Sequence, residues 1–440
     1  MSGRHGSDAG DGSVGSRRPM AVMLAVVVPL LVASGVGLAT VWPAAPGPAD
    51  DPGAAGRPAG LVDLSDNEQV PAEVVATAGE VCEGAPDDLL PDGSVPLPFL
   101  CATADVRVLS GPEAGDVVQV PLPPQVFTAG VAAGERVVLG RNADVVVENT
   151  VEVVAAGDVV YSWVDFDRSR ALLLLVAVFA VLVVAVGRLR GLAAIGGLAL
   201  SYLALAYVVL PALRQGENAL LVAVSVSVPL MTVVLYLAHG FSTRTTAALL
   251  GTVFGLLATT GLAAFASSAA SLNGLTDEDA YALSAFTTGT DLGGIVLCGL
   301  VVAGLGILND VTITQVSSVW EIKSLAPRAG FAELFRSGMR VGRDHLASTV
   351  YTIAFAYAGA ALPTMLLLRL YGQPLDQVLT SGAIAEEIAR TAVGSIGMIL
   401  AIPVTTAIAA ASVAAGRVMG PVEPAVANGA SSGAGEGVTV

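Results

Sequence analysis

The sequence predicts an all-α polytopic membrane protein with about eight transmembrane helices and a small extracytoplasmic β domain inserted between helices 1 and 2. Three observations lead to this fold class: an apolar composition, eight apolar stretches of spanning length, and acidic charge confined to one segment. Of the 440 residues, 54% are hydrophobic and only 13% are charged, and the mean hydropathy is +0.73. A soluble globule cannot hide that much apolar surface.

Eight apolar stretches approach the roughly 20 residues that a helix needs to cross about 30 Å of hydrocarbon. They occupy residues 20–42, 171–186, 192–210, 219–238, 247–266, 292–308, 348–368 and 391–415. Arg17 and Arg18 precede the first stretch and, by the positive-inside rule, keep the N-terminus in the cytoplasm. We expect this stretch to remain as an anchor. The alternative is a twin-arginine export signal, whose removal would leave seven spans.

The alternation that follows from this orientation concentrates basic residues in the cytoplasmic segments, as the positive-inside rule requires. The cytoplasmic set is Arg188, Arg190, Arg244, Lys323, Arg328, Arg336, Arg340, Arg343 and Arg417, and the outer loops between spans hold Arg214, Arg369 and Arg390. Both termini are then cytoplasmic. Residues 1–19 and 416–440 are predicted to be cytoplasmic tails, the second of them disordered, and residues 169–415 a seven-helix membrane domain.

The acidity lies in the outer segment between the first two spans. Residues 43–168 contain 21 Asp and Glu against 5 Arg, which accounts for the whole net charge of −16. Such a chain lacks the basic face that a nucleic-acid partner needs. The proline-rich start of the segment predicts a linker, with order from about residue 98. Short β runs at 106–108, 117–120, 136–139 and 144–147, separated by turn residues, predict a small antiparallel barrel or sandwich.

The three cysteines divide between the two regions. Cys82 and Cys101 lie in the outer segment, where an oxidising exterior favours a disulfide. The alternative is two free thiols in a flexible lead-in. Cys298 lies inside the sixth span and is expected to be a packed, inert thiol.

Residues 327–346 read as an amphipathic helix. Phe331, Leu334, Phe335 and Met339 recur at helical spacing on one side, and Arg336, Arg340 and Arg343 on the other. A basic amphipathic helix beside a span is predicted to lie on anionic headgroups. A coupling element or a docking face for a cytoplasmic partner is the alternative.

Polar residues at the end of the sixth span are the strongest functional signal. Asp310, Thr314, Ser317 and Glu321 would form one stripe on a continued helix. An ionisable side chain inside the bilayer costs about 3 kcal/mol, so the stripe must face other helices, a cavity, or the cytoplasm if the helix has already emerged. Asp310 within the membrane and Asp310 at its cytoplasmic edge both remain open.

Two later segments add ionisable groups. His345, with Thr349 and Thr352 on the same face, could meet the Asp310 stripe and exchange protons near neutral pH, while Asp344 is either part of that site or a helix cap. At the outer end of the eighth span, spacing favours a pair between Glu386 and Arg390 and leaves Glu387 as the more interesting acid. Asp277, Glu278, Asp279 and Asp291, near Thr287, Thr288 and Thr290, suggest solvated loop acids or a cation-attracting vestibule.

The chain carries no HExxH or CxxC metal pattern and, with one lysine, no phosphate-binding loop. A GxSxG match at residues 429–433 lacks the strand and helix that such a nucleophile needs. We therefore expect no enzyme activity, no metal and no cofactor.

Three segments resemble one known family. They are residues 306–315 (GILNDVTITQ), 342–349 (GRDHLAST), and 385–391 (AEEIART) continuing through Gly394 and Gly397 to Pro403. Together they resemble the YibE/F-like family of bacterial multi-pass membrane proteins, over about residues 161–410. The resemblance implies a bacterial membrane domain and supplies no substrate. The family pattern has aspartate at the place of Asn309, so a two-carboxylate site is not implied for this chain.

The preferred hypothesis is a secondary transporter or export-related permease of unknown substrate in the bacterial cytoplasmic membrane, proton-coupled through an intramembrane aspartate. The alternative is a non-transporting scaffold, or an assembly or signalling protein, whose outer β domain binds a protein partner. The lipid bilayer is the expected partner in both cases. The residues assigned to the ion or proton pathway are Asp310, Thr314, Gln315, His345, Thr349 and Glu387.

Overall fold

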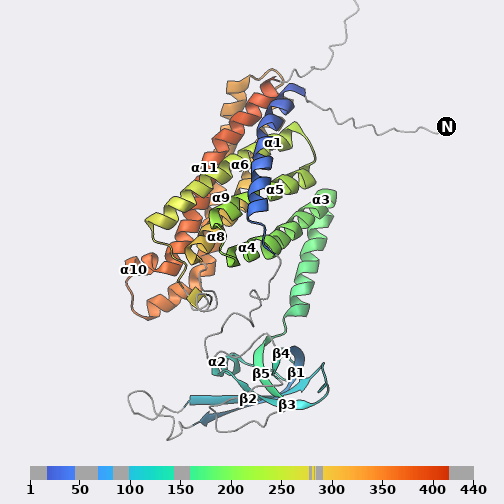
Figure 1. The fold of residues 1–440 in the computed structure, drawn as a ribbon, viewed down its shortest axis with the longest axis vertical. Helices are drawn as coiled ribbons and strands as arrows, with labels where there is room; N and C mark the ends of the chain where they lie inside the picture. Colours follow the sequence, from blue (N-terminus) through green and yellow to red (C-terminus); the bar gives the residue numbers. More distant parts are fainter. Residues whose placement is uncertain are drawn as a thin grey trace, which may run out of the picture. The chain divides into compact units, whose positions relative to one another are not determined.

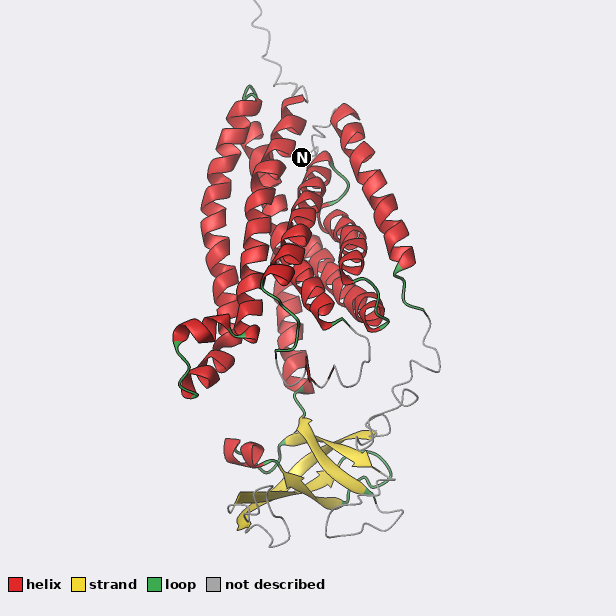
Figure 2. Ribbon diagram, turned by 60° about the vertical axis from the view of Figure 1, so that its left-hand side comes forward, coloured by secondary structure: helices red, strands yellow, loops and turns green. Residues whose placement is uncertain are grey.

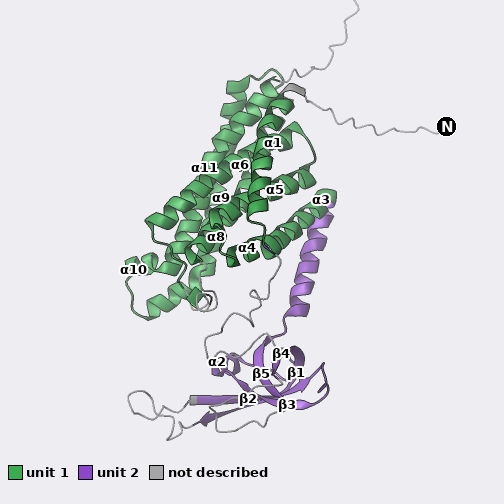
Figure 3. Cartoon of the chain, in the orientation of Figure 1, with its two compact units in different colours: residues 1–43, 189–440 green, residues 44–188 purple. Residues whose placement is uncertain are grey.

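The structure, a computed structural model, describes residues 17–44, 68–82, 99–142, 159–276, 280–281, 283 and 291–415. The chain divides into two compact units (Figure 3). One comprises Met1–Pro43 with Leu189–Val440, and the other Ala44–Arg188. Each is considered by itself below.

The smaller unit contains one five-stranded antiparallel sheet in the order β3-β2-β1-β4-β5 (Figures 1 and 2). The strands are β1 (Glu68–Cys82), β2 (Phe99–Val108), β3 (Val117–Leu122), β4 (Arg136–Asn142) and β5 (Val160–Phe166). The outer strands β3 and β5 contact each other, so the sheet curls toward closure, and helix α2 (Pro124–Ala129) stands between β3 and β4. This strand order with this helix position is the topology of an OB-fold, a partly open five-stranded barrel.

The expectation that order begins near residue 98 is wrong, because β1 is a 15-residue strand that pairs with both β2 and β4. Its inward side chains Val70, Ala72 and Val74 are buried at every second position, as a sheet face requires. Pro71 and Gly79 disfavour a strand, which weakened its signal in the sequence. Three of the expected β runs fall in β2, β3 and β4, and the run at 144–147 lies outside the described residues.

Among the described residues, seven helical stretches are long and apolar enough to cross a membrane. The helices are α1 (Arg17–Thr40), α3 (Ser169–Ala204) with the π-helix η1 (Leu205–Val209) and α4 (Leu210–Arg214), α5 (Ala219–His239), α6 (Thr243–Ala269), α8 (Leu292–Leu325), α9 (Phe331–Leu370) and α11 (Gly382–Ala415); a short helix α10 (Leu375–Thr380) lies between α9 and α11. The protein is therefore a mostly helical, multi-pass membrane protein by length and composition.

The second helical stretch contains two of the eight predicted spans. Its 46 residues would extend about 69 Å at 1.5 Å per residue, more than twice the hydrocarbon thickness. Arg188 leaves the helical conformation, with φ 52° and ψ −130°, between the predicted spans at 171–186 and 192–210. All eight predicted stretches thus lie in helices, and the stretches at 171–186 and 192–210 lie one on each side of this break.

One end of the helical unit gathers several helix termini. Thr246 of α6 contacts Met20 of α1 at 3.5 Å, and Ser412 of α11 contacts Met23 of α1 at 3.7 Å. The apolar cluster around these contacts also contains residues of α8 and α9 near the turn that joins them. The start of α1, the α5–α6 turn, the α8–α9 turn and the end of α11 therefore share this end. We call it the basic end, after Arg244, Lys323 and Arg328.

Helices α6, α8 and α11 form the tightly packed centre of the unit. Gly251 of α6 faces Thr405 of α11, and Gly255 of α6 faces Leu308 of α8, so closely that a Cβ atom would not fit at either glycine. The buried hydroxyls of Thr252 and Thr312 share a hydrogen bond of 2.7 Å between α6 and α8. Small residues and short hydroxyl side chains allow this close approach, as is usual between membrane helices.

Candidate functional site

The structure brings together two of the predicted site residues from different helices. Asp310 Oδ2 of α8 lies 3.6 Å from His345 Nε2 of α9, and the side chains are 66% and 30% exposed, respectively. At this distance the groups attract each other as an ion pair when the imidazole is protonated, without forming a normal hydrogen bond. The pair is the only ion pair between helices α8 and α9 among the described residues.

The geometry of the α8–α9 hairpin explains why these residues meet. Asp310 lies 15 residues before the end of α8 at Leu325, and His345 lies 14 residues after the start of α9 at Phe331. Both are therefore about 21 to 23 Å from the turn, at 1.5 Å per residue. Asp310 also lies 19 residues from Asp291, the N-cap of α8, or about 28 Å, close to the full hydrocarbon thickness.

The predicted neighbours of Asp310 have different roles. Gln315 is buried and donates a hydrogen bond of 2.6 Å from Nε2 to the Gly338 carbonyl, so it links α8 to α9. Thr349 donates to the His345 carbonyl of its own helix at 3.0 Å. Thr314 is half-buried on α8. Gln315 and Thr349 are thus held by backbone carbonyls and are not directed at Asp310.

The polar stripe of α8 lies on the more open side of that helix. Asp310 and Glu321 are exposed and Thr314 and Ser317 are half-buried, whereas the opposite side, with Val311, Val316 and Val319, is buried. The Arg244 guanidinium of α6 donates to the Ser317 hydroxyl. Arg244 and Ser317 are 73 residues apart, so no local pattern in the sequence associates Arg244 with the stripe.

Helix α9 corrects two expectations. The predicted amphipathic helix at 327–346 is not a separate surface helix but the first part of a continuous 40-residue helix. Its Leu334, Gly338 and Gly342 are buried, and Gly338 and Gly342 pack against side chains of α8 and α11. Nothing between Arg343 and Ser348 breaks a helix. Asp344 is therefore exposed in mid-helix, and its interpretation as a cap is wrong.

The outer acids also differ from expectation. Arg390 pairs with Glu387, with Nη1 and Oε1 2.5 Å apart, where Glu386 was the expected partner. The Arg390 guanidinium also lies over the ring of Tyr357 of α9, 5.9 Å from its centre. Glu386 is buried, with 9% of its surface exposed. A spacing of three residues on a helix serves the pair as well as a spacing of four.

These two polar clusters do not meet. His345 and Tyr357 are 12 residues apart on α9, or about 18 Å, and the buried side chains of Ile353 and Met398 lie at levels between them. Asp291, from the predicted vestibule, caps α8 by accepting a hydrogen bond from the Gly294 amide at 3.0 Å. The other predicted vestibule residues, Asp277, Glu278, Asp279 and the threonines at 287, 288 and 290, lie outside the described residues.

A cavity of about 350 Å³ opens elsewhere in the helical unit. It lies between the second half of α3, η1, α5 and α8, and Leu198, Ser201, Leu205, Ser227, Met231 and Gly306 are among its lining residues. None of the predicted pathway residues lines it.

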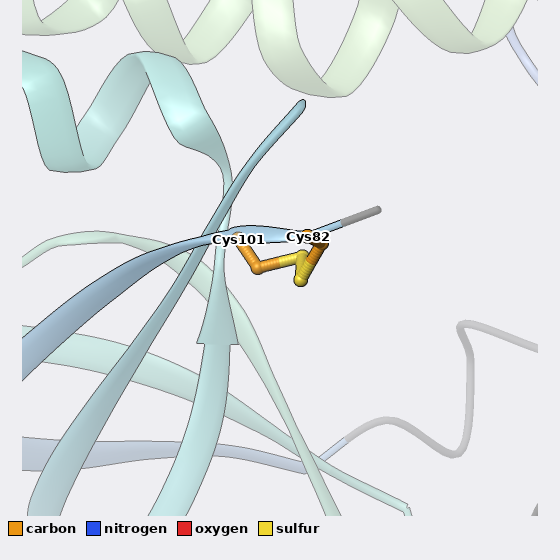
Figure 4. Close-up of a disulfide and its surroundings, with 2 residues drawn as sticks. All are labelled: Cys82 and Cys101. Atoms are coloured by element: carbon orange, nitrogen blue, oxygen red, sulfur yellow. A yellow bond between two sulfur atoms is a disulfide. The ribbon is translucent and has the colours of Figure 1, made fainter. Parts of the chain in front are cut away.

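The β unit holds the predicted cysteine pair. Cys82 at the end of β1 and Cys101 in β2 form a disulfide, with Cα atoms 5.7 Å apart (Figure 4). Cys298 is buried in α8 as a free thiol. The disulfide joins the two strands at the end of the β1–β2 hairpin where they are connected, opposite the end at which Ala72 pairs with Val108.

A cluster of hydrogen-bonded polar side chains lies at the opposite end of β1. Arg141 of β4 donates two hydrogen bonds to Glu113, of 2.9 and 2.7 Å, and the Tyr161 hydroxyl donates a third of 3.1 Å. The Arg141 hydrogen bonds lower the pKa of Glu113 to about 2, and burial together with the neighbouring Glu113 raises the pKa of Tyr161. We call Glu113, Arg141 and Tyr161 the arginine clamp.

The sequence profile of the YibE/F-like proteins matches residues 175–415, more than half of the chain. The match covers the membrane helices from α3 to α11, apart from the first six residues of α3, and includes Asp310, His345, Glu387 and the cavity. No curated protein and no solved structure matches the chain. The chain therefore belongs to the YibE/F-like protein family.

Proposed function

We propose that the protein is a secondary transporter or export-related permease of the bacterial cytoplasmic membrane, rather than an enzyme, and that Asp310 and His345 form its proton-binding pair. The observation that carries the proposal is the 3.6 Å approach of their side chains between two helices of spanning length. Imidazole is the side chain that ordinarily takes up and releases a proton near neutral pH, and a neighbouring carboxylate stabilises its protonated form. Ionisable groups on membrane helices are costly, and they are found where ions or protons pass.

The arrangement along α9 supports a pathway with two stations. Asp310 and His345 form one station, and Glu387 with Arg390 forms the other, about 18 Å further along α9 at 1.5 Å per residue. Apolar side chains, including Ile353 and Met398, separate them. An apolar layer between two polar stations prevents free leakage of ions, and its transient opening would admit a proton or a substrate from one side at a time.

Orientation follows from charge. The basic end would face the cytoplasm by the positive-inside rule, which puts both termini on that side. The Asp310–His345 station then lies near the cytoplasmic boundary of the hydrocarbon, and the 66% exposure of Asp310 gives it access to protons there. The Glu387–Arg390 station lies toward the outer side.

The experiment needs no known substrate. Proteoliposomes that contain the full chain are adsorbed on a solid-supported membrane and given an acidifying step across neutral pH. Wild type should produce a transient current, because a proton taken up at the Asp310–His345 station moves through the membrane field toward the Glu387–Arg390 station. Asp310→Asn keeps the shape of the side chain and should lose most of this current. Asp344→Asn removes an exposed acid on the adjacent residue of α9 and should retain it.

The outcome can refute the proposal directly. If Asp310→Asn and Asp344→Asn both keep the wild-type current, Asp310 binds no transported proton. The same follows if neither wild type nor variant produces any current although both are folded and correctly inserted.

The separate β unit, with its own core and an OB-fold topology, favours a second candidate: a non-transporting scaffold or signalling protein that binds an extracytoplasmic partner. The two candidates differ in a deletion strain. A scaffold requires that a chain without residues 43–166 fails to complement while Asp310→Asn complements fully. A permease requires the failure of Asp310→Asn.

A further inference from the structure

The cavity of about 350 Å³ lies at mid-depth of the membrane helices. Leu305, in its wall, is 13 residues from the start of α8 at Leu292, or about 20 Å, against a hydrocarbon thickness of about 30 Å. The lining is almost entirely aliphatic, with Ser201, Tyr202 and Ser227 as its hydroxyl groups. Tyr202 is exposed, so the cavity opens on the surface of the helical unit. An opening at this depth faces lipid chains.

The cavity walls are irregular in ways that keep the space open. The π-helix η1 forms part of one wall, and π-turns are frequent at functional sites. Pro229 interrupts α5 between the lining residues Ser227 and Met231. A Cβ atom on Gly306 of α8 would meet no other atom within 4 Å. The walls therefore leave room that no side chain of the described chain fills.

A cluster of basic side chains stands at the basic end of the same groove. Gly196 of α3 lies beside Leu237 of α5, with 3.7 Å between an ideal Cβ position and the leucine side chain, so the start of this half of α3, with Arg190, lies toward the end of α5 at His239. Arg244 follows on α6, just after the α5–α6 turn, and the side chains of Arg190, His239 and Arg244 are exposed. Residues 186–200 and 236–250 contain no Asp or Glu. On α8, Arg244 contacts Ser317, and the acid on that face, Glu321, lies one helical turn further along.

An exposed aromatic side chain accompanies the cluster. Phe241 is 84% exposed and stacks on Tyr236, with ring centres 4.4 Å apart. Aromatic rings are frequent where membrane helices meet the headgroups. The cluster therefore combines the positive charge and the aromatic surface of a lipid-headgroup boundary.

The spacing between cluster and cavity matches one lipid leaflet. The second half of α3 packs against α5, because an ideal Cβ atom placed on Gly197 would lie 3.2 Å from the Val234 side chain. The lining residues Leu198 and Ser201 lie 8 and 11 residues after Arg190 on α3. The distance along the helix axis is therefore about 12 to 16 Å. Half of the hydrocarbon layer is about 15 Å.

We propose that this groove is a binding site for an anionic phospholipid, with the phosphate at Arg190 and Arg244, beside His239, and one acyl chain in the cavity. The converging positive charges select the headgroup, and the aliphatic walls accept the chain. The site goes beyond the transport proposal and does not depend on Asp310.

The headgroup is tested by native mass spectrometry of the full chain released from nanodiscs that contain phosphatidylglycerol or phosphatidylcholine. Wild type should retain one phosphatidylglycerol in preference to phosphatidylcholine. Arg190→Gln with Arg244→Gln should weaken this retention about 30-fold, since each arginine near the surface contributes about fivefold. Arg340→Gln with Arg343→Gln removes two exposed arginines of α9 and should change retention less than about twofold.

The acyl chain is tested with a matched pair of glycine substitutions on α8. Gly306→Leu fills the cavity, whereas Gly299→Leu adds the same side chain two turns earlier on the same face, also where no atom lies within 4 Å. Gly306→Leu should lose the lipid and Gly299→Leu should keep it, with melting temperatures confirming that both are folded. Equal retention of the two lipids by wild type overturns the proposal. Unchanged lipid retention by Gly306→Leu also overturns it. Displacement of the lipid by inorganic phosphate overturns it as well, because this result would indicate a site for the free anion.

Discussion

Replacing Gly251 by alanine tests how closely the central helices of the membrane unit approach. An alanine Cβ at this position of α6 would lie 2.9 Å from both the Cβ and the Cγ2 of Thr405 on α11, and nearer still to its hydroxyl oxygen. Real Cβ atoms do not approach other atoms this closely, so either the helices separate or a side chain leaves its rotamer. Thr405 is fully buried, so its side chain has no free space to enter.

The expected magnitude follows from two opposing effects. Alanine in place of glycine inside a helix stabilises by about 1 kcal/mol. Overpacking in a filled core costs about 1 to 3 kcal/mol, so Gly251→Ala should lower the free energy of unfolding by up to about 2 kcal/mol and should not raise it. At Gly261, on the exposed side of the same helix, a Cβ meets no atom within 4 Å, and Gly261→Ala should stabilise by up to about 1 kcal/mol.

A second substitution locates the cause. Thr405→Ala removes the γ atoms that the new methyl group would strike, including a hydroxyl that has no hydrogen-bond partner among the described residues. The double variant Gly251→Ala with Thr405→Ala should therefore recover the loss, with a coupling energy of about 1 to 2 kcal/mol.

Steric trapping in bicelles measures the free energy of unfolding for all four chains. The reasoning is refuted if Gly251→Ala stabilises as much as Gly261→Ala, because the helices would then not be in contact at Gly251. It is also refuted if the substitution of Thr405 leaves the loss at Gly251 unchanged, because the two effects would then be independent.

Three further predictions concern the β unit and the basic end. Because the pKa of Glu113 is lowered to about 2, the arginine clamp stabilises the β unit fully above the ordinary carboxyl pKa and less as the pH falls from about 4.5 toward 2. Glu113→Gln should therefore make the stability of the β unit less dependent on pH in this range. Trp163 fluorescence, in variants without the other tryptophans, follows unfolding of the β unit. Lys323, the single lysine, is buried and donates a hydrogen bond of 2.9 Å to the Ala329 carbonyl. Lys323→Met should therefore lower the free energy of unfolding by about 1.5 to 3 kcal/mol. Equal stability of the variant and the wild type in steric trapping would show that the hydrogen bond contributes nothing. Reduction of the disulfide, or Cys82→Ser with Cys101→Ser, should destabilise the β unit by about 3 kcal/mol for a loop of this length. Urea unfolding of the full chain in nanodiscs measures this loss, and an unchanged urea midpoint of the β unit would contradict it.

The positions of the membrane helices were predictable from the sequence because insertion into lipid depends on apolar composition added up over about 20 neighbouring residues. All eight predicted stretches lie in helices, and the family motifs were also visible in the local sequence. The β strands of the outer unit were less predictable. β1 carries Pro71 and Gly79, and it becomes a strand only because β2 and β4 pair with both of its edges.

The candidate site was only partly predictable. The sequence identified Asp310 and His345 as unusual, yet their 3.6 Å separation depends on an uninterrupted α9 and on equal distances from the α8–α9 turn. It also favoured Glu386 as the partner of Arg390, whereas Arg390 pairs with Glu387. Residues three and four apart both meet on a helix, so spacing alone does not choose between them.

The sequence by itself thus determined which segments enter the membrane and which residues carry charge there. Tertiary structure decided which of those residues meet: Asp310 with His345, Arg244 with Ser317, and Arg390 with Glu387. The physical reason is that each residue turns a helix face by about 100°. Contacts between helices therefore depend on rotation and relative height, which are fixed by packing between distant segments and leave no local pattern.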